Sequence, residues 1–121
     1  MIQGLGSDIV SVDRIKKVID RKKDAFIFHV FTKKEIDYCK KFKKSYLRFA
    51  GRFCAKEAIV KALGTGISKN ISWQDIEIIN DYSGKPIVTL SDRVNEKFNF
   101  PKIFISISHT DTTAFAIAIW N

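Results

Sequence analysis

The sequence over residues 46–66 is YLRFAGRFCAKEAIVKALGTG, and it contains the longest helical pattern of the chain. Apolar side chains recur there at helical spacing and form one face: Phe49, Ala50, Phe53, Cys54 and Ala58. Gly64 then stands where a glycine commonly ends a helix. The pattern predicts a helix from about Tyr46 to Leu63.

A charged pair, Glu57 and Lys61, lies one turn apart on the same side of this helix as Phe53. Its ordinary interpretation is an i,i+4 salt bridge, worth about a few tenths of a kcal/mol. If the face is partly buried, however, the carboxylate needs a cation or a metal to compensate its desolvation. The pair alone favours the salt bridge.

A second carboxylate, Asp8, follows two glycines in an apolar and β-branched segment, Ile2–Val12. This segment predicts a strand that ends near Asp8. Asp8 has an ordinary interpretation as a strand-end residue, but glycine in a strand often marks close approach by a ligand or by another backbone. Together with Glu57 it would supply the hard oxygen ligands that Mg²⁺ prefers. The spacing leaves both interpretations open.

Three further patterns complete the N-terminal half. Ser11 or Asp13 can cap a first helix. Its buried stripe is Ile15, Val18, Ile19, Ala25 and Phe26. The sequence from Thr32 to Glu35 matches a capping box and predicts a short helix as far as about Phe42.

After Gly66 the apolar period changes from helical to alternating. It predicts strands over 73–79 and 87–90, a helix over 92–98, and a closing hairpin of strands 103–108 and 113–120. The order β-α-α-α-β-β-α-β-β predicts an α+β fold with a largely antiparallel sheet. The length of 121 residues predicts a single domain spanning 1–121.

The net charge of the chain is concentrated in one segment. Lys and Arg number 21 and Asp and Glu number 13, so the formal charge is +8. Between Ser11 and Arg48 there are 13 basic and 5 acidic residues, which already gives +8, and the remaining 8 basic and 8 acidic residues cancel. This one-sidedness predicts an acidic partner, although a solvated surface is an equally ordinary interpretation.

Several classes of protein are excluded by composition. A content of 45% hydrophobic residues argues against a disordered basic tail. The longest apolar run, Ala114–Trp120, is too short for a membrane span, and the N-terminus lacks the pattern of a signal peptide, so we expect a cytoplasmic protein with no membrane partner. Cys39 and Cys54 form no C-x-x-C pair, and His29 and His109 are the only imidazoles, so we do not expect a His/Cys zinc site.

A nucleic-acid-binding module is the rival class, since the pI is about 9.6 and the chain has ten phenylalanines. The aromatic residues fall mostly at buried spacing, and no RRM, OB or helix-turn-helix signature stands out. Such a module would also leave Glu57 unexplained. We therefore expect no nucleic acid partner.

Four segments together resemble the holo-[acyl-carrier-protein] synthase group of the 4'-phosphopantetheinyl transferases. Residues 4–10, GLGSDIV, resemble its G-[IL]-G-x-D-[IL] motif, and residues 52–66 resemble its most specific signature, [RW]-F-x-x-K-E-A-x-x-K-A-x-G-T-G. Residues 84–86, GKP, and 106–110, SISHT, resemble a middle turn and a C-terminal motif. The resemblance covers nearly the whole chain.

The resemblance implies an enzyme that moves the 4'-phosphopantetheine arm of coenzyme A onto a serine of apo acyl carrier protein, in support of fatty acid biosynthesis. It implies that Asp8 and Glu57 ligate Mg²⁺ and that Lys61 binds a phosphate oxygen or steadies the leaving group. The proton acceptor would be a water bound to the metal or held by Glu57 or Asp8. A scaffold that has lost activity is a third possibility, which the intact Asp8, Glu57 and Lys61 oppose.

The resemblance also implies two binding surfaces and a homotrimer with an active site at each subunit interface. Around the coenzyme A nucleotide it places Arg52, Lys61, Gly64, Gly66, Lys85, Pro86, His109 and Thr110. On the first helix, which docks the acidic carrier protein, the candidates are Arg14, Lys17 and Arg21, with apolar contacts from Phe26 and Phe53. By itself, His109 has an ordinary interpretation as a turn residue. Gly64 to Gly66 likewise fit a plain helix stop.

Overall fold

A computed structural model describes all residues, 1–121, and confirms the α+β class. Its elements follow in chain order: β1 (Gly4–Ser11), α1 (Val12–Lys22), α2 (Asp24–Val30), α3 (Lys33–Cys39), α4 (Ser45–Leu63), the 3₁₀ turn η1 (Trp73–Asp75), β2 (Ile76–Asn80), β3 (Pro86–Leu90), α5 (Asp92–Lys97), β4 (Ile103–His109) and β5 (Thr113–Trp120). None of the helices is long and apolar enough to cross a membrane.

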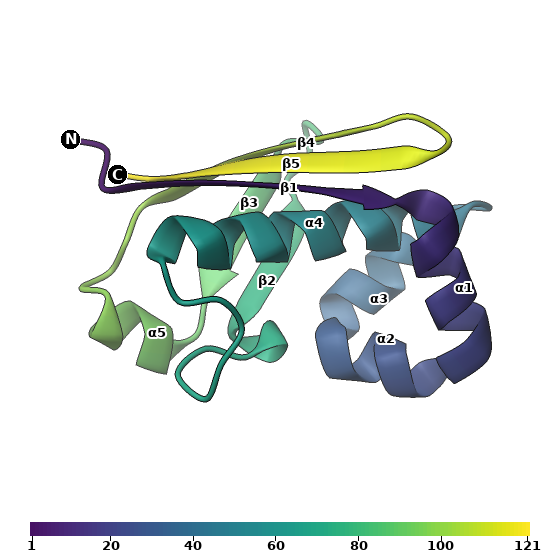
Figure 1. The fold of residues 1–121 in the computed structure, drawn as a ribbon, viewed down its shortest axis with the longest axis horizontal. Helices are drawn as coiled ribbons and strands as arrows, with labels where there is room; N and C mark the ends of the chain where they lie inside the picture. The colour runs from purple at the N-terminus through teal and green to yellow at the C-terminus, as the bar shows by residue number, and fades with distance from the viewer.

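The strands form two antiparallel sheets, not one. β1, β5 and β4 make a three-stranded sheet in that order, and β2 pairs with β3 in a separate hairpin. All the helices lie on one side of the three-stranded sheet, and α4 runs along it (Figure 1). On that side β5 presents only alanines to the core, at positions 114, 116 and 118, which are fully buried. These small side chains let α4 lie close to the sheet.

β1 approaches α4 even more closely, through its two glycines. A Cβ atom on Gly6 would lie 2.0 Å from the carbonyl oxygen of Ala58, and one on Gly4 would lie 2.0 Å from that of Ala62. The glycines therefore serve the approach of another backbone, one of the two roles that the sequence left open. The contact places the middle of β1 beside the second half of α4.

The N-terminal segment differs from its prediction in two ways. β1 does not end near Asp8 but continues to Ser11, and Asp8 pairs with Ala116 in mid-strand. Of the two candidate caps, Ser11 is the one used, since its hydroxyl accepts the N–H of Arg14 at 3.3 Å.

The predicted first helix is two helices. Lys23 has φ of 51° and its N–H bonds to the carbonyl of Ile19, which closes α1 before α2 begins. The chain thereby turns, and Ile27 and Val30 of α2 become buried in a second apolar cluster around Phe31 and Phe49. The element order therefore has four helices before β2, where the sequence predicted three.

The capping box at Thr32 and Glu35 is confirmed, but its helix, α3, ends at Cys39 and not at Phe42. Residues 73–75, predicted as the start of a strand, form the turn η1. The carboxylate of Asp75 accepts the N–H of Ser72 at 2.7 Å, which bends the chain before β2. Gly64 ends α4 with φ of 79°, as its position predicted.

Candidate active site

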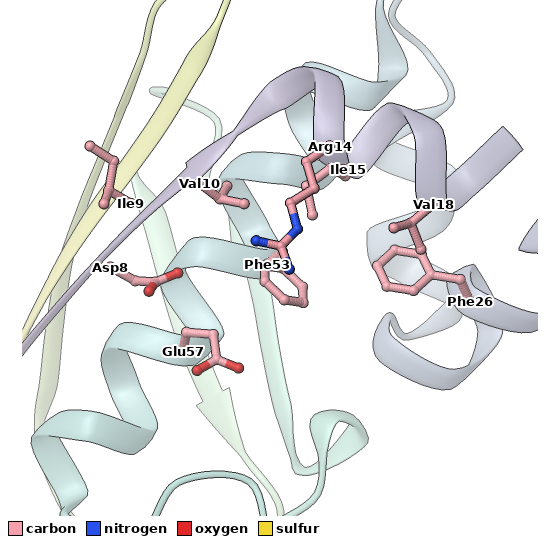
Figure 2. A pocket seen from close by; sticks show the side chains of 9 residues that line it. All are labelled: Asp8, Ile9, Val10, Arg14, Ile15, Val18, Phe26, Phe53 and Glu57. Atoms are coloured by element: carbon pink, nitrogen blue, oxygen red, sulfur yellow. The ribbon is translucent and has the colours of Figure 1, made fainter. Parts of the chain in front are cut away.

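The close approach of β1 to α4 brings Asp8 and Glu57 to the wall of one cavity. Its volume is about 300 Å³, and both carboxylates border it, from β1 and α4 respectively (Figure 2). The rest of the wall comes from β1, α1, α2 and α4: Ile9, Val10, Arg14, Ile15, Val18, Phe26 and Phe53. The two carboxylates thus lie at one end of a pocket that is otherwise mostly apolar.

Burial and a like charge act on the Glu57 carboxylate. Partial burial raises its pKa, the negative charge of Asp8 raises the pKa further, and the nearby Lys61 lowers it. A half-buried carboxylate beside another carboxylate is costly to keep ionised unless a cation joins it. The site therefore favours a cation between β1 and α4.

Lys61 connects α4 to β1 beside the two carboxylates. Its Nζ donates to the Asp8 Oδ1 at 3.2 Å and to the Ser7 carbonyl at 3.0 Å. The expected i,i+4 salt bridge between Glu57 and Lys61 is wrong, because the ammonium reaches over to β1 instead. All three residues proposed for catalysis are thus neighbours in the structure.

The two carboxylates fit a hard divalent cation. They offer oxygen ligands only, and no group of three or more His, Cys, Asp or Glu side chains that could hold a metal ion occurs in the structure. Mg²⁺ is commonly held by one or two carboxylates, with water and substrate phosphates as its other ligands. Asp8 and Glu57 are the residues that would hold it.

Cys54 lies beneath Asp8 and is not a nucleophile. Its Sγ is buried and donates to the Ala114 carbonyl at 3.4 Å. Burial raises the pKa of this thiol to about 12, and the charges of Asp8 and Glu57 contribute to the rise. The thiol therefore stays protonated near neutral pH.

The apolar end of the cavity is part of an aromatic stack. The ring of Phe53 lies 6.2 Å from that of Phe26 and 5.1 Å from that of Trp73, against which it stacks. Phe26 and Phe53, both predicted to contact a carrier protein, are therefore close to the carboxylates. Trp73 was missed as a support of this wall because the alternating pattern placed it in a strand.

The basic face of α1 borders the cavity directly. A groove of about 450 Å³ is lined by Ser11, Asp13, Arg14, Lys17, Val18 and Arg21. Arg14 lines both hollows, and its side chain extends from α1 toward the space above Phe53 (Figure 2). Lys17 is bound to Asp13 at 2.9 Å, whereas Arg14 and Arg21 form no ion pair. The structure thus places the three predicted docking cations on one continuous surface with the carboxylates.

Arg52 lies elsewhere and is bound within the chain. Its side chain is buried, its guanidinium stacks over the Tyr38 ring at 4.2 Å, and it donates to Asn80. Asn80 in turn donates to the Gly84 carbonyl at 2.7 Å, which connects Arg52 to the β2–β3 turn. The Nε atom of Arg52 is buried without a partner.

None of the other residues predicted to bind coenzyme A lines the cavity either. His109 and Thr110 are exposed where β4 ends, Lys85 and Pro86 line a groove against β4, and Gly64 and Gly66 follow α4. Lys61 does not line the cavity either, but it binds Asp8, which does. A single chain does not bring the residues of the carboxylate cavity together with those predicted to bind coenzyme A. The role of the latter residues stays a prediction.

Comparison with known proteins identifies the family to which the chain belongs. The family model described as the 4'-phosphopantetheinyl transferase superfamily matches residues 4–119. The chain belongs to this superfamily. As a phosphopantetheinyl transferase it is an enzyme, and the matched range contains both carboxylates and Lys61.

Several of its relatives are named holo-[acyl-carrier-protein] synthase. The protein of that name from Protochlamydia amoebophila is 49% identical over 121 residues, which cover 100% of this chain and 99% of the relative. The crystal structure of the Neisseria meningitidis synthase superposes with a TM-score of 0.92 at 32% identity, covering 100% of this chain and 99% of that one. The Helicobacter pylori synthase, solved in complex with coenzyme A, has a TM-score of 0.87 at 38% identity, with coverage of 97% and 99%.

Proposed function

We propose that this phosphopantetheinyl transferase moves the 4'-phosphopantetheine group from coenzyme A to a serine hydroxyl of an apo acyl carrier protein, with Mg²⁺, in support of cytoplasmic fatty acid biosynthesis. The serine Oγ attacks the phosphorus that carries the pantetheine arm. The bond from that phosphorus to the bridging oxygen breaks, and adenosine 3',5'-bisphosphate leaves with the electron pair. The serine proton passes to a water.

The observation that carries this proposal is the meeting of Asp8 and Glu57 in one cavity, beside the basic face of α1. Bound Mg²⁺ would neutralise charge on the phosphate under attack and orient it for in-line displacement. The two carboxylates hold the cation. Lys61, which can act as a point charge on a phosphate oxygen, lies next to Asp8.

For the carrier protein we propose docking on α1. An acidic helix would meet Arg14, Lys17 and Arg21, and apolar side chains beside the serine would enter the cavity against Phe26 and Phe53. The exposure of the basic face and its continuity with the carboxylates support this arrangement. Docking there would bring the serine close to Asp8.

We further propose a homotrimer in which a neighbouring subunit completes the coenzyme A site. The nucleotide residues would be Arg52, Gly64, Gly66, Lys85, Pro86, His109 and Thr110, together with Lys61. Two facts support a shared site: these residues, Lys61 aside, lie away from the cavity within one chain, and the outer face of the three-stranded sheet carries several exposed large apolar side chains. On that face Leu5 is 64% exposed and Phe104 is 54% exposed.

The test is to incubate the protein with Mg²⁺, coenzyme A and an apo acyl carrier protein, and to weigh the carrier. We expect a mass gain of one phosphopantetheine per carrier, and none in EDTA. Asp8→Ala and Glu57→Ala should each abolish the gain while the circular dichroism spectrum stays native. Absence of any gain, under conditions where an established transferase modifies the same carrier, would refute the proposal.

A further inference from the structure

The ammonium of Lys61 is fixed at two points of β1. It is 3.2 Å from the Asp8 Oδ1 and 3.0 Å from the Ser7 carbonyl oxygen. Both contacts cross from α4 to β1 at the edge of the cavity. Lys61 therefore already neutralises one of the two carboxylates that would hold a divalent cation, while Glu57 forms no ion pair of its own.

A positive charge in this place opposes the binding of a second one. Charges about 4 Å apart still interact strongly at the effective dielectric of a protein surface. A divalent cation that joins Asp8 and Glu57 must either tolerate the ammonium or displace it. An anion arriving at the same place removes the conflict, because Lys61 can transfer its hydrogen bonds to the anion.

The side chain of Lys61 is free to make this move. It is 52% exposed, it belongs to neither buried cluster, and its ammonium forms no polar contact besides those with Asp8 and Ser7. By contrast Lys56, one residue before Glu57, is completely buried and bound to Glu35, Val30 and Trp73. Of the two lysines near Glu57 on α4, Lys56 and Lys61, only Lys61 can change partners without repacking the core.

We propose that Lys61 is a latch that weakens divalent-cation binding in the free protein and that coenzyme A opens it. The pyrophosphate of coenzyme A draws the ammonium away from Asp8, so that cation and coenzyme A bind cooperatively. This inference rests on the proposed function, because it takes Asp8 and Glu57 as the cation ligands. A coupling of this kind between two ligands is usually worth about fivefold or more in affinity.

The test measures Mn²⁺ binding directly, from the electron paramagnetic resonance signal of the free ion, without a turnover assay. Wild type, Lys61→Met and Lys61→Arg are titrated with and without coenzyme A, and Glu57→Gln serves as the variant with a damaged site. Methionine keeps most of the apolar stem of the lysine, and arginine keeps the charge. Thermal melts confirm that each variant is folded.

Without coenzyme A, Lys61→Met should bind Mn²⁺ about fivefold or more tightly than wild type, and Lys61→Arg should stay weak. Coenzyme A should tighten Mn²⁺ binding much more in wild type than in Lys61→Met. Equal or weaker binding by Lys61→Met in the absence of coenzyme A would overturn the latch alone. Undiminished binding by Glu57→Gln, or no binding by wild type even with coenzyme A, would overturn the proposed metal site and the latch with it.

Discussion

Asp75 joins the turn η1 to the residues around the start of α5 through its side chain. Both of its carboxylate oxygens accept from the Arg93 Nε at 3.0 Å, and Ser91 donates to it at 2.6 Å. The bond from Arg93 is the main reason why the pKa of this carboxyl is held well below its usual range. One ionised side chain thereby connects η1 to the start of α5.

We expect Asp75→Asn to lower the unfolding free energy by about 2 kcal/mol at pH 7. A folded-state pKa below the unfolded one gives stability that is present above the ordinary pKa of about 4 and is lost as the pH falls toward the folded pKa. The gap in Tm between wild type and Asp75→Asn should therefore narrow from pH 7 to pH 3. Asp111→Asn, at an exposed hairpin tip, is the control. A gap of the same size at both pH values would contradict the assignment.

At this scale the sequence predicts local hydrogen bonds well and distant ones poorly. The caps at Ser11 and Thr32 are correct because donor and acceptor lie within three residues of each other. The buried pair of Glu35 and Lys56, whose atoms are 2.7 Å apart, was not foreseen, since 21 residues separate its members. Glu35 appears in the sequence as a capping residue only, although it also accepts the N–H of Ile78.

The contact between β1 and α4 sets the geometry of the site at the scale of elements. It depends on Gly6, where an added Cβ would lie 2.0 Å from one backbone atom of α4 and 2.7 Å from another. Backbone atoms at such distances cannot rotate away as a side chain would. Any side chain at residue 6 must therefore push β1, and Asp8 with it, away from Glu57.

We expect Gly6→Ala to lower the unfolding free energy by about 1–3 kcal/mol or more. Transfer to the carrier should fall by a larger factor than the loss of folded protein accounts for. Ser7→Ala is the matched control, because its side chain points to the opposite, exposed face of the same strand. Thermal melts and carrier mass gain measure the two effects. Full transfer by a folded Gly6→Ala protein would show that the spacing of β1 and α4 does not govern the site.

The cations of α1 are not equivalent, and this gives a prediction for that helix. Lys17 is held by Asp13, whereas Arg14 and Arg21 are unpaired. Arg14→Glu and Arg21→Glu should therefore raise KM for the carrier protein strongly and leave KM for coenzyme A nearly unchanged. Lys17→Ala should raise KM for the carrier protein less than Arg14→Ala does.

Lys33→Ala is the control for Lys17→Ala, since Lys33 forms a comparable exposed i,i+4 pair with Asp37 on α3. It should leave KM for the carrier close to that of wild type. Equal effects of Arg14→Glu on the KM values of carrier and coenzyme A would show that the carrier protein does not dock on α1.

Element prediction from this sequence is accurate where periodicity is long and fails at bends. The pattern over residues 46–63 gives α4 to within one residue. The break at Lys23 has no sequence signal, because a lysine with positive φ is held by the packing of Ile27 and Val30 and not by local preference. The same segment carries Phe26, whose place in the cavity depends on that break.

On the scale of the whole molecule, the charged and apolar surfaces separate. The groove along the basic face of α1 adjoins the cavity of the two carboxylates at Arg14, and the outer face of the three-stranded sheet lies away from the helices (Figure 1). Sequence composition predicts the basic surface, since its cations cluster along the chain. It does not predict the sheet face, which is assembled from three strands distant in sequence.

The register of the strands aligns apolar side chains across that outer face. Leu5 pairs with Ile119, which pairs with Phe104, and Ile9 pairs with Phe115. Leu5, Ile9, Phe104 and Phe115 are all exposed in the single chain. An apolar face of this kind commonly marks a protein interface, and burying it in a homotrimer would also supply the extra burial that a chain of 121 residues benefits from.

We therefore expect Leu5→Lys to dissociate the proposed trimer, because assembly would bury three ammonium groups in an apolar interface. Light scattering after size exclusion should give three times 13.9 kDa for wild type and a lower mass for the variant. Tyr82→Lys, which changes a fully exposed aromatic residue in the β2–β3 turn, should remain a trimer. Leu5→Lys should also modify less carrier protein than wild type does, although Leu5 does not line the cavity. A monomeric wild type with full transfer would show instead that one chain holds a complete site.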